Sequence, residues 1–465
     1  MGGRAGECVA NVNNEHLDLT IKDRSASRTP AALPVLLPEL AGSKAAWAGV
    51  ETAELLQRGC DQRGLLDRLA AKGIRHVIVP LNGASEDSCL FARKHVDLGL
   101  SNTPAPITLY DLAHRDEGAF TRLKFMLEAA RSSGLLIGLS LFDASPSVTS
   151  GPFRKGGNIQ GATLAAAPSS PVDEKLFATL GSVVDWICSA VRGFRGLWID
   201  VFRNASGTPS ALERLLCARV AETLARHGDD LSPARLGPWI AVRRPDMLRE
   251  RHSAQAAPFD ISRDMPTDCP ALDFASAMWA AESAAGTSES DFIFQRAPHR
   301  QPALLRFSEH ALDGARSDWL WRAFFRGYWP TAALHVNQAS DAPHLNTLAA
   351  IARFSVVWAG RGALRPYPEM LAPMHESVGA SMFAAEDGTG RFFAYFSEPA
   401  VNGLALALPP GFYRFYWFDP YSDTIMDRDE GVEGGPRISI PGCMDATAKL
   451  LIFEQDESPD PLSVW

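Results

Sequence analysis

Acidic and other polar side chains are concentrated where short apolar runs of this sequence end. The positions with this property are Glu51, Glu86, Asp87, Asp143, Asp200, Arg203, Asn204, Glu309 and His310. Carboxylates dominate the set. Two carboxylates that flank a glycosidic bond, one donating a proton and the other acting as nucleophile or base, are the minimum apparatus of glycoside hydrolysis. The residue types therefore favour acid–base chemistry on a sugar.

Aromatic side chains lie near the same apolar runs and would suit the lining of a sugar-binding mouth. They are Trp198, Phe202, Trp239, Trp279 and Trp329. Core packing is the simpler explanation of each of them when it is taken singly, because aromatic side chains dominate the energetics of protein cores. The aromatic residues support a sugar site only together with the carboxylates.

The elements that would position these side chains alternate between strand and helix patterns. The clearest unit is an amphipathic helix over residues 62–72, which Gly73 ends, followed by a strand over 74–81. Further helices are predicted near residues 120–133, 174–191, 210–226, 318–326 and 345–358. Further strands are predicted at 32–37 or 47–51, and at 135–142, 196–202, 238–242, 272–275, 303–307 and 331–336. This order is typical of repeated βα units and a parallel sheet.

The number of predicted strands approaches eight, and no Gly-x-Gly-x-x-Gly follows an early strand. A closed barrel therefore fits better than an open sheet. We predict an α/β fold, with a (β/α)8 TIM barrel over residues 29–361 after an irregular N-terminal arm over 1–28. Two predicted βα loops, about 82–117 and 143–172, are rich in Pro, Gly and Ser. Loops of this length are usually functional or disordered.

After residue 361 the sequence changes to short alternating runs separated by turn signals. The runs cover residues 379–383, 391–396, 403–408, 412–419, 437–440 and 448–453. They predict a small antiparallel β-sandwich domain over residues 362–465. The aromatic run 412–418 is most simply a strand with one buried face, and a platform for a sugar or a protein is the alternative.

Composition excludes some classes of function. The 45 basic and 54 acidic residues give a net charge of −9 without a Lys/Arg-dense stretch, which argues against nucleic acid as a partner. No apolar run reaches the roughly 20 residues of a membrane-spanning helix, so we expect a soluble chain with no transmembrane segment. The first 30 residues lack the order of a secretory signal. A cytoplasmic location follows, unless a signal has already been removed.

Neither a metal nor a cofactor is expected. The seven cysteines are widely spaced and contain no Cys-x-x-Cys pair. His76, His310 and His335 have no metal-ligand spacing, so hydrogen-bonded histidines are the simpler interpretation.

Several segments together resemble one family. They are residues 47–56 (WAGVETAELL), 65–79 (LLDRLAAKGIRHVIV), 110–114 (YDLAH), 120–142, 301–305 (QPALL), 318–327 (DWLWRAFFRG) and 411–420 (GFYRFYWFDP). In type and order they are similar to apiosidase-like glycoside hydrolases of clan A, which are TIM barrels with a C-terminal β-sandwich of collagen-binding type. The resemblance covers most of residues 45–455.

The departures from that family concern its catalytic residues. The resemblance implies an Asn-Glu pair at the end of the fourth strand, with Glu as acid/base, but residues 198–204 read WIDVFRN and place Arg203 and Asn204 there. An amide cannot donate the proton. The nucleophile would fall near Phe307, with Glu309 two residues later, and a bulge would bring Glu309 into place. Asp200 lies on the side of Asn204 by period-two alternation, which leaves Asp200 and Glu309 as the best carboxylate pair.

Structural roles compete with these site roles. Asp200 is equally explained as a buried carboxylate paired with Arg203, Arg243 or Arg306. Glu309 fits a solvated loop position, and Asp143 fits the cap of a turn. These alternatives stay open on the sequence alone.

Two functions remain. The first is a catalytically impaired glycoside-hydrolase-like barrel, retained for binding a glycan or as a structural subunit of an assembly. The second is an active glycoside hydrolase that uses Asp200 and Glu309 as its catalytic pair. In either case a carbohydrate is the expected ligand, and a protein partner or a homo-oligomer is left open. The expected sugar-binding residues are Glu51, Asp143, Arg203, Asn204, Trp239 and His310.

Overall fold

The computed structural model describes most of the chain between residues 48 and 456. The described ranges are 48–82, 88–96, 107–143, 151–164, 173–194, 196–203, 211–226, 239–243, 248–250, 274–279, 292–294, 303–307, 318–325, 328–337, 342–358, 364–373, 382–397, 403–443, 445 and 449–456. The predicted N-terminal arm, residues 1–28, lies outside them, as does the alternative first strand at 32–37.

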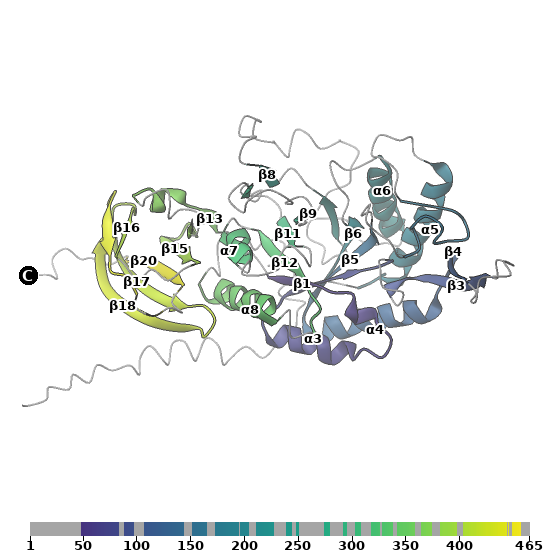
Figure 1. Ribbon diagram of the computed structural model, residues 1–465, viewed down its shortest axis with the longest axis horizontal. Coiled ribbons are helices and arrows are strands. Elements are labelled where there is room, and N and C mark those ends of the chain that lie inside the picture. The colour runs from purple at the N-terminus through teal and green to yellow at the C-terminus, as the bar shows by residue number, and fades with distance from the viewer. Residues whose placement is uncertain are drawn as a thin grey trace, which may run out of the picture.

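Eight parallel strands close into a barrel, in the order β1-β12-β11-β9-β7-β6-β5-β2. The strands are β1 (Gly49–Glu51), β2 (His76–Pro80), β5 (Leu136–Asp143), β6 (Leu197–Arg203), β7 (Trp239–Arg243), β9 (Phe274–Trp279), β11 (Ala303–Phe307) and β12 (Trp329–Ala333). Strand β1 closes the ring because it pairs with both β2 and β12. The predicted parallel barrel is therefore confirmed (Figure 1).

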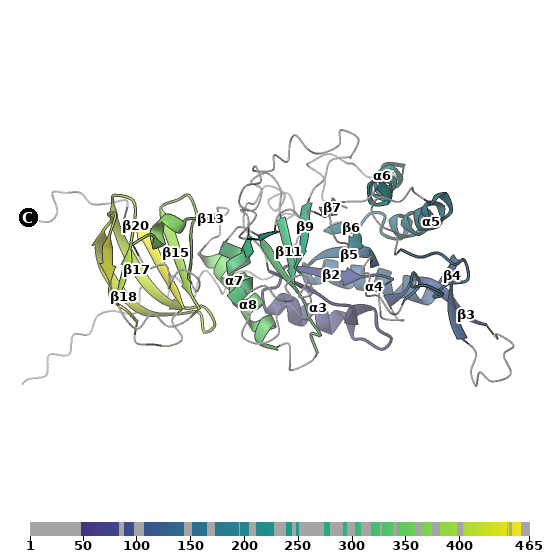
Figure 2. The same ribbon diagram turned by 45° about the horizontal axis from the view of Figure 1, so that its top comes forward.

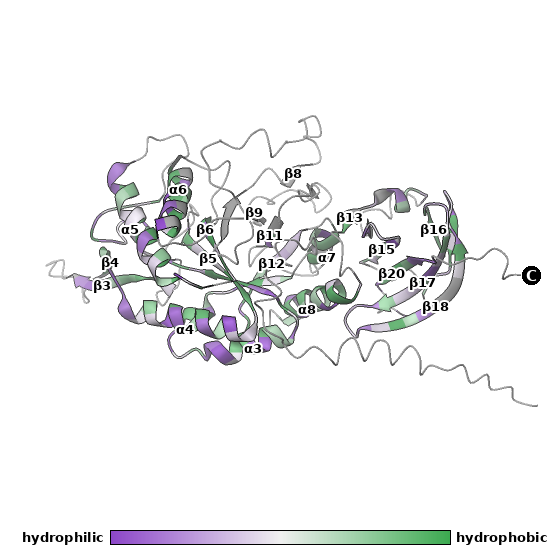
Figure 3. Cartoon of the chain, turned by 180° about the vertical axis from the view of Figure 1, so that it is seen from behind, coloured by the Kyte–Doolittle hydropathy of each residue, from purple (hydrophilic) through white to green (hydrophobic). Residues whose placement is uncertain are grey.

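Helices surround the barrel at the places that the sequence pattern indicates. They are α3 (Gln62–Ala71), α4 (Glu117–Ser133), α5 (Glu174–Ala190), α6 (Ala211–Arg226), α7 (Asp318–Phe325) and α8 (Ala342–Val357). Helix α4 shows why the boundaries are predictable: Asp116 accepts a hydrogen bond from the Ala119 amide, and Gly134 ends the helix at φ 74°. Figure 3 shows α3 and α4 with mixed polar and apolar residues, whereas α8 is mostly apolar. No helix of the described residues is long and apolar enough to cross a membrane.

Two glycines make room for large side chains inside the barrel. A Cβ atom on Gly49 would lie 1.9 Å from the His76 ring, and one on Gly138 would lie 2.2 Å from the Trp198 ring. Both rings are fully buried. Small and large residues on neighbouring strands therefore fill this part of the interior jointly, as close packing requires.

The segment predicted as a long loop over 82–117 contains a β-hairpin instead. Strands β3 (Phe91–Val96) and β4 (Ile107–Arg115) pair antiparallel. Tyr110 of β4 also forms a parallel bridge with Asn158, so the hairpin is joined to the segment 151–164 that follows β5. A second short pair, β8 (Leu248–Glu250) with β10 (Phe292–Phe294), was not expected from the sequence.

The C-terminal part contains two antiparallel sheets. Six strands follow the order β13-β14-β15-β20-β17-β18, and β16 pairs with β19. Their bounds are β13 (Arg365–Pro366), β14 (Met382–Glu386), β15 (Arg391–Phe396), β16 (Leu404–Leu406), β17 (Phe412–Asp419), β18 (Thr424–Glu433), β19 (Ile438–Ile440) and β20 (Leu450–Gln455). The sequence reading missed β13 and β18. Strand β18 was missed because it is a charged edge strand, a design that protects a sheet edge but removes the apolar pattern.

The six-stranded sheet is buried on both faces. On β17, Tyr413, Phe415 and Trp417 pack with side chains of β16 and β19, whereas Tyr416 and Phe418 belong to the cluster that includes the barrel core. Period-two alternation thus gives each face its own core. The reading of residues 412–418 as a strand with one buried aromatic face was incomplete, because the second face is covered as well.

Aromatic rings join the barrel to this sheet. The ring of Trp321 on α7 stacks on Tyr395 of β15 at 5.2 Å. Phe354 on α8 lies 5.5 Å from Phe393 and 6.2 Å from Phe418, measured between ring centroids. The apolar surface of α8 follows from this position between the barrel and the sheet. Figures 1 and 2 both show α7 and α8 on the side of the barrel that faces the C-terminal strands.

We expect Phe354→Ala to lower the free energy of unfolding by about 3–5 kcal/mol, because it leaves a cavity where the barrel and the sheet meet. Phe125→Ala is the matched control: Phe125 on α4 is 54% exposed, and its loss should change stability by no more than about 0.5 kcal/mol. Urea denaturation of both variants measures the difference. Equal small losses would show that the joint contributes little to stability.

Candidate functional site

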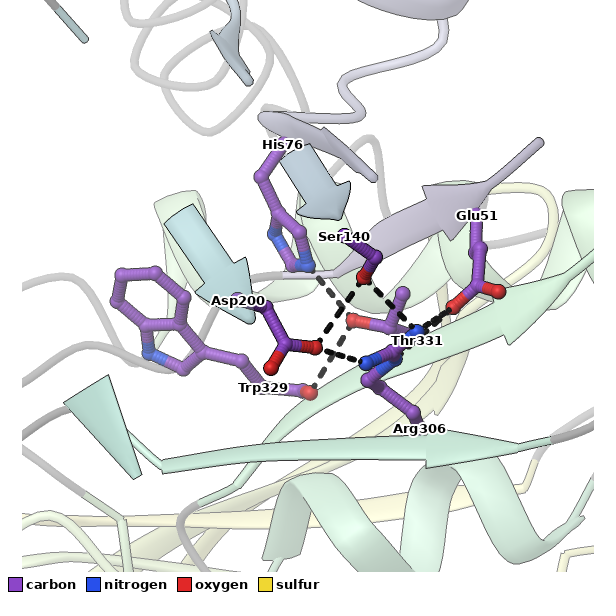
Figure 4. A network of polar contacts seen from close by, with 7 residues as sticks. All are labelled: Glu51, His76, Ser140, Asp200, Arg306, Trp329 and Thr331. Atoms are coloured by element: carbon purple, nitrogen blue, oxygen red, sulfur yellow. Dashed lines mark hydrogen bonds and ion pairs between the residues drawn. The ribbon is translucent and has the colours of Figure 1, made fainter. Parts of the chain in front are cut away.

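The candidate site is a group of polar side chains inside the barrel, centred on Arg306 of β11. Arg306 lies opposite Thr331 of β12 in the parallel ladder, and Asp200 of β6 lies opposite Ser140 of β5. Side chains of a strand alternate between its two faces, so Leu305 and Phe307 point away from the interior that Arg306 enters. Figure 4 shows Arg306, Asp200, Ser140 and Glu51 converging from four strands.

Arg306 bridges two carboxylates. Its Nη1 donates to Asp200 Oδ2 at 2.5 Å, and its Nη2 and Nε donate to Glu51 Oε2 at 2.5 and 2.9 Å. Ser140 completes the arrangement, because its hydroxyl donates to Asp200 Oδ2 at 3.1 Å and accepts from Arg306 Nη2 at 3.3 Å. The side chains of Arg306, Glu51 and Asp200 are only 2–3% exposed. We call these four residues the Arg306 cluster.

The Arg306 cluster contains two acidic groups and one cation, and this imbalance governs its titration. Burial away from water raises the pKa of Asp200 to about 6, against the opposing attraction of Arg306. Burial also disfavours the charged guanidinium, but the nearby carboxylates outweigh that effect and hold the pKa of Arg306 above its ordinary value. The cation is therefore permanent, and Asp200 can take up a proton near pH 6.

A second polar contact lies beside the cluster. His76 Nε2 is 2.6 Å from the hydroxyl of Thr331, and the His76 ring centroid lies 5.7 Å from that of Trp329. Burial lowers the pKa of His76 to about 3, so the imidazole is neutral. The interpretation of His76 as a hydrogen-bonded histidine of the core is confirmed (Figure 4).

Aromatic side chains cover the cluster on the side of β5 and β6. Phe142 and Phe202 occur two residues after Ser140 and Asp200, so by alternation they point to the same interior one layer nearer the strand ends. Their ring centroids are 5.8 Å apart, and Phe153 packs on Phe142 at 5.5 Å. Asp200 thus lies below a layer of aromatic rings rather than at the strand ends.

The structure brings together some of the predicted site residues and leaves others untested. Glu51 and Asp200 meet through Arg306, one of the three arginines that the sequence offered as structural partners. Asp143 ends β5 opposite Arg203 in the ladder, outside the Arg306 cluster. The backbones of Arg203 and Trp239 are described, but their side chains are not, and Asn204, Glu309 and His310 lie outside the described residues.

Sequence reasoning missed the roles of Ser140 and Thr331. A signal for Ser140 was present, because it is the polar residue within the buried run of β5, at a position whose alternation points inward. Thr331 gave no comparable signal, since threonine is common in strands for reasons of shape.

A second polar cluster joins the loops that follow β2 and β5. The Asp111 carboxylate is 2.5 Å from Lys94 Nζ and 2.8 Å from His114 Nδ1, and it accepts a hydrogen bond from Gln160 at 2.7 Å. The hydrogen bond from Lys94 is the main reason why the pKa of Asp111 lies well below its usual range. Asp111 and His114 belong to the segment 110–114 that the sequence analysis singled out. Asp111 acts there as the structural link between the two loops.

A metal site needs several ligand side chains close together. Within the part of the chain that the structure describes, no group of three or more His, Cys, Asp or Glu side chains could hold a metal ion.

Comparison with solved structures finds the same architecture in proteins named as glycoside hydrolases. One, named "Glycoside hydrolase", aligns with a TM-score of 0.55 and 9% identity over 91% of this chain and 99% of its own. A glycoside hydrolase family 5 protein from Bacteroides vulgatus aligns with a TM-score of 0.55 and 10% identity, over 90% and 92% of the two chains. No protein-family model and no curated protein matches the sequence. The chain therefore has a glycoside-hydrolase-like fold.

Removal of the central cation tests the structural weight of the cluster. We expect Arg306→Met to lower the free energy of unfolding by about 3–5 kcal/mol, because two carboxylates then stay buried without it. Arg219→Met is the control: Arg219 lies 2.6 Å from Asp185, but it is 35% exposed, so its loss should cost about 1 kcal/mol or less. Urea denaturation at neutral pH measures both. Similar losses in the two variants would contradict the structural role of Arg306.

The raised pKa of Asp200 predicts a pH-dependent stability. A folded-state pKa of about 6, above the ordinary 3.8, gives a stabilising contribution that is complete at low pH and is lost as pH rises through about 6. Between about pH 4 and pH 8 the loss corresponds to roughly 2 kcal/mol. Asp200→Asn removes the titrating group. Over this pH range the free energy of unfolding of wild type should therefore fall by that amount relative to the variant, as measured by urea denaturation.

Asp185→Asn provides a control of opposite sign. Burial alone would raise the pKa of Asp185, but the contacts with Arg219 and Thr223 outweigh burial and lower it. The stabilisation from Asp185 is therefore lost as pH falls. If wild type and Asp200→Asn respond to pH identically, the pKa of Asp200 is not raised.

Proposed function

We propose that this protein is a catalytically impaired relative of the glycoside hydrolases whose fold it shares, retained for binding a carbohydrate. The observation that carries the proposal is the bridge from Arg306 to both Asp200 and Glu51 in the buried interior. The Asp200 side chain is only 3% exposed and shares a guanidinium with Glu51, which works against its contact with a glycosidic oxygen. General acid catalysis requires hydrogen-bond reach to that oxygen.

The fourth strand supports the same proposal. In the family that the sequence resembles, this strand ends in Asn-Glu, and the Glu is the acid/base. Here the corresponding residues are Arg203 and Asn204. Loss of a general acid typically lowers the rate by about 10²–10⁴-fold. With the glutamate of the fourth strand replaced and Asp200 bound to Arg306, little general acid catalysis would remain.

Carbohydrate binding at the C-terminal ends of the strands is the function that such a barrel would retain. In TIM barrels the functional residues lie on the βα loops at this face. Asp143 ends β5 there, and Arg203, Asn204, Trp239 and His310 occur near strand ends in the sequence. We propose these residues as contacts for the sugar. The fold analogy gives the ligand class only, since one barrel fold hosts many functions.

The C-terminal part completes the proposed organisation. We propose that residues 362–465 form a β-sandwich domain next to a barrel over 29–361. Leu404 and Leu406 of β16 and Ile438 and Ile440 of β19 share a core with Trp417 of the larger sheet, which supports the sandwich. The aromatic contacts of α7 and α8 with β15 would hold the two parts together as one rigid unit. We propose that this unit also serves as a subunit of an assembly or of a homo-oligomer.

An active glycoside hydrolase is the second candidate, and one observation favours it. A carboxyl group with a pKa of about 6 has the acidity that a general acid needs near neutral pH. In that case Asp200 would donate the proton and Glu309 would be the nucleophile or base. The position of Asp200 below Phe142 and Phe202 speaks against this alternative.

Release of reducing sugar from a panel of glycans separates the two candidates. For the impaired protein we expect no turnover by wild type, while binding of at least one glycan of the panel is detected by calorimetry. Glu309→Gln should leave that binding within about threefold, because a single charged group usually contributes little to affinity.

Turnover by wild type that Glu309→Gln abolishes would establish the active hydrolase instead. Asp200→Asn is the accompanying variant: it should abolish such turnover if Asp200 is the acid. Absence of both turnover and binding across the panel would contradict carbohydrate binding itself.

A further inference from the structure

Helix α8 ends in two exposed apolar side chains, although most of the helix is buried. Val356 is 50% and Val357 is 42% exposed. Within the part of the chain that the structure describes, no other two exposed large apolar residues are adjacent in the sequence. Exposed apolar residues that occur singly are normal, whereas a contiguous apolar surface marks a place of contact. We call Val356 and Val357 the valine pair.

The valine pair lies where the barrel meets the C-terminal sheet. Ala352 and Arg353 precede the two valines by four residues each, so they are their neighbours on the helix surface. A Cβ atom on Gly73, in the turn before β2, would lie 3.4 Å from Ala352 Cβ. Arg353 donates to the backbone oxygen of Tyr421 at 3.0 Å, in the turn between β17 and β18. Figures 1 and 2 show α8 between α3 and the C-terminal strands.

The described chain also begins close to the valine pair. Ala48 O accepts a hydrogen bond from the Arg75 amide at 3.4 Å, and Arg75 follows Gly73 by two residues. Gly73 in turn lies against Ala352 of α8. These contacts occur at the end of the barrel where its strands begin, because α8 runs back from the end of β12 toward the start of β1. Ala48 therefore lies beside the last turns of α8.

The sequence before Ala48 contains an apolar run that barrel closure leaves over. Residues 30–40 read PAALPVLLPEL, with seven alanine, valine and leucine residues and one charged residue. The run includes residues 32–37, one of the two alternatives for the first strand, but Gly49–Glu51 forms β1 and closes the barrel. Burial of these apolar side chains against another surface would be favourable.

Residues 41–47 tether this run within reach of the valine pair. Seven residues span at most about 25 Å when fully extended. A tether of that length gives an effective concentration of about millimolar, so a contact of modest area is sufficient. Three of the eleven residues of the run are proline, which limits its unbound conformations and lowers the entropy lost on binding.

We propose that residues 30–40 pack on the valine pair of the same chain. The run would lie across the junction formed by α8, the turn before β2 and the turn between β17 and β18. It would add an apolar contact to the aromatic rings that already join the barrel to the C-terminal sheet. This inference is independent of carbohydrate binding, and its tests measure proximity and stability rather than ligand binding.

Photocrosslinking of the full chain tests the proposal. A photoreactive p-benzoylphenylalanine takes the place of Leu36, and mass spectrometry identifies the crosslinked peptides. We expect a crosslink within one chain to α8 or to the turn over 420–423. Val356→Gln/Val357→Gln should lower its yield about fivefold or more, because glutamine side chains do not offer the apolar surface.

Phe125→Gln/Leu215→Gln is the matched control for that double variant. Phe125 on α4 is 54% exposed and Leu215 on α6 is 44% exposed, so the control removes comparable apolar surface elsewhere on the barrel. It should leave the crosslink yield unchanged. Circular dichroism of both double variants checks that they are folded.

Deletion of residues 1–41 gives an independent measurement. In urea denaturation the deletion should raise the unfolding equilibrium constant of the otherwise unchanged chain about tenfold, because an apolar contact is lost. In the Val356→Gln/Val357→Gln background the same deletion should change that constant less than about twofold, because the two changes remove one shared contact.

Three outcomes would overturn the proposal. Crosslinks that join chains of normal and heavy isotope content in a mixture would assign the valine pair to a second copy of the chain. No crosslink to α8 or its neighbouring turn, or a yield that the two glutamines do not lower, would place the run elsewhere. An equal effect of the deletion in both backgrounds would show that residues 30–40 and the valine pair act separately.

Discussion

The buried guanidinium of Arg306 is the constraint on which the barrel interior depends. A charge in such a place is tolerated only when it is paired and hydrogen-bonded, and its partners come from β1, β5 and β6. These strands are far apart in the sequence. A one-residue slip in any of them would turn Glu51, Ser140 or Asp200 away from the interior and leave the charge unmatched. The ion pairs therefore specify register in a barrel whose remaining interior contacts, such as Trp198 against Gly138, specify shape.

Two barrel strands are connected directly to the helices that pack on the C-terminal sheets. Strand β11, which carries Arg306, leads into α7, and β12 leads into α8. Trp321 and Phe354 on these helices pack on Tyr395 and Phe393. Because the sheet is buried on this face and on the opposite one, its aromatic strands are a structural joint rather than a ligand platform. The position of the barrel strands and that of the sheet are thus fixed by one connected core.

The sequence allowed prediction of what depends on periodicity and missed what depends on contacts between distant residues. Helix α4 and strands β15 and β17 were predictable, because caps and alternating apolar residues are local signals. Strand β18 was missed because its charges hide a strand at an edge. The alternative in which Asp200 is a buried carboxylate paired with an arginine is confirmed, with Arg306 as the partner, whereas its catalytic role stays a prediction. The bridge to Glu51 was not predicted, because only barrel closure brings β1 and β11 to the same interior.

A glycosidase needs its carboxylates to change protonation in contact with a substrate, whereas a structural ion pair needs them to stay bound to a cation. The guanidinium at 2.5 Å from Asp200 Oδ2 occupies one of the two carboxylate oxygens and competes with a substrate for it. The free energy gained from the bridge opposes any movement of Asp200 toward the strand ends. If ligand recognition persists in this barrel, it must therefore depend on residues above the aromatic layer of Phe142 and Phe202.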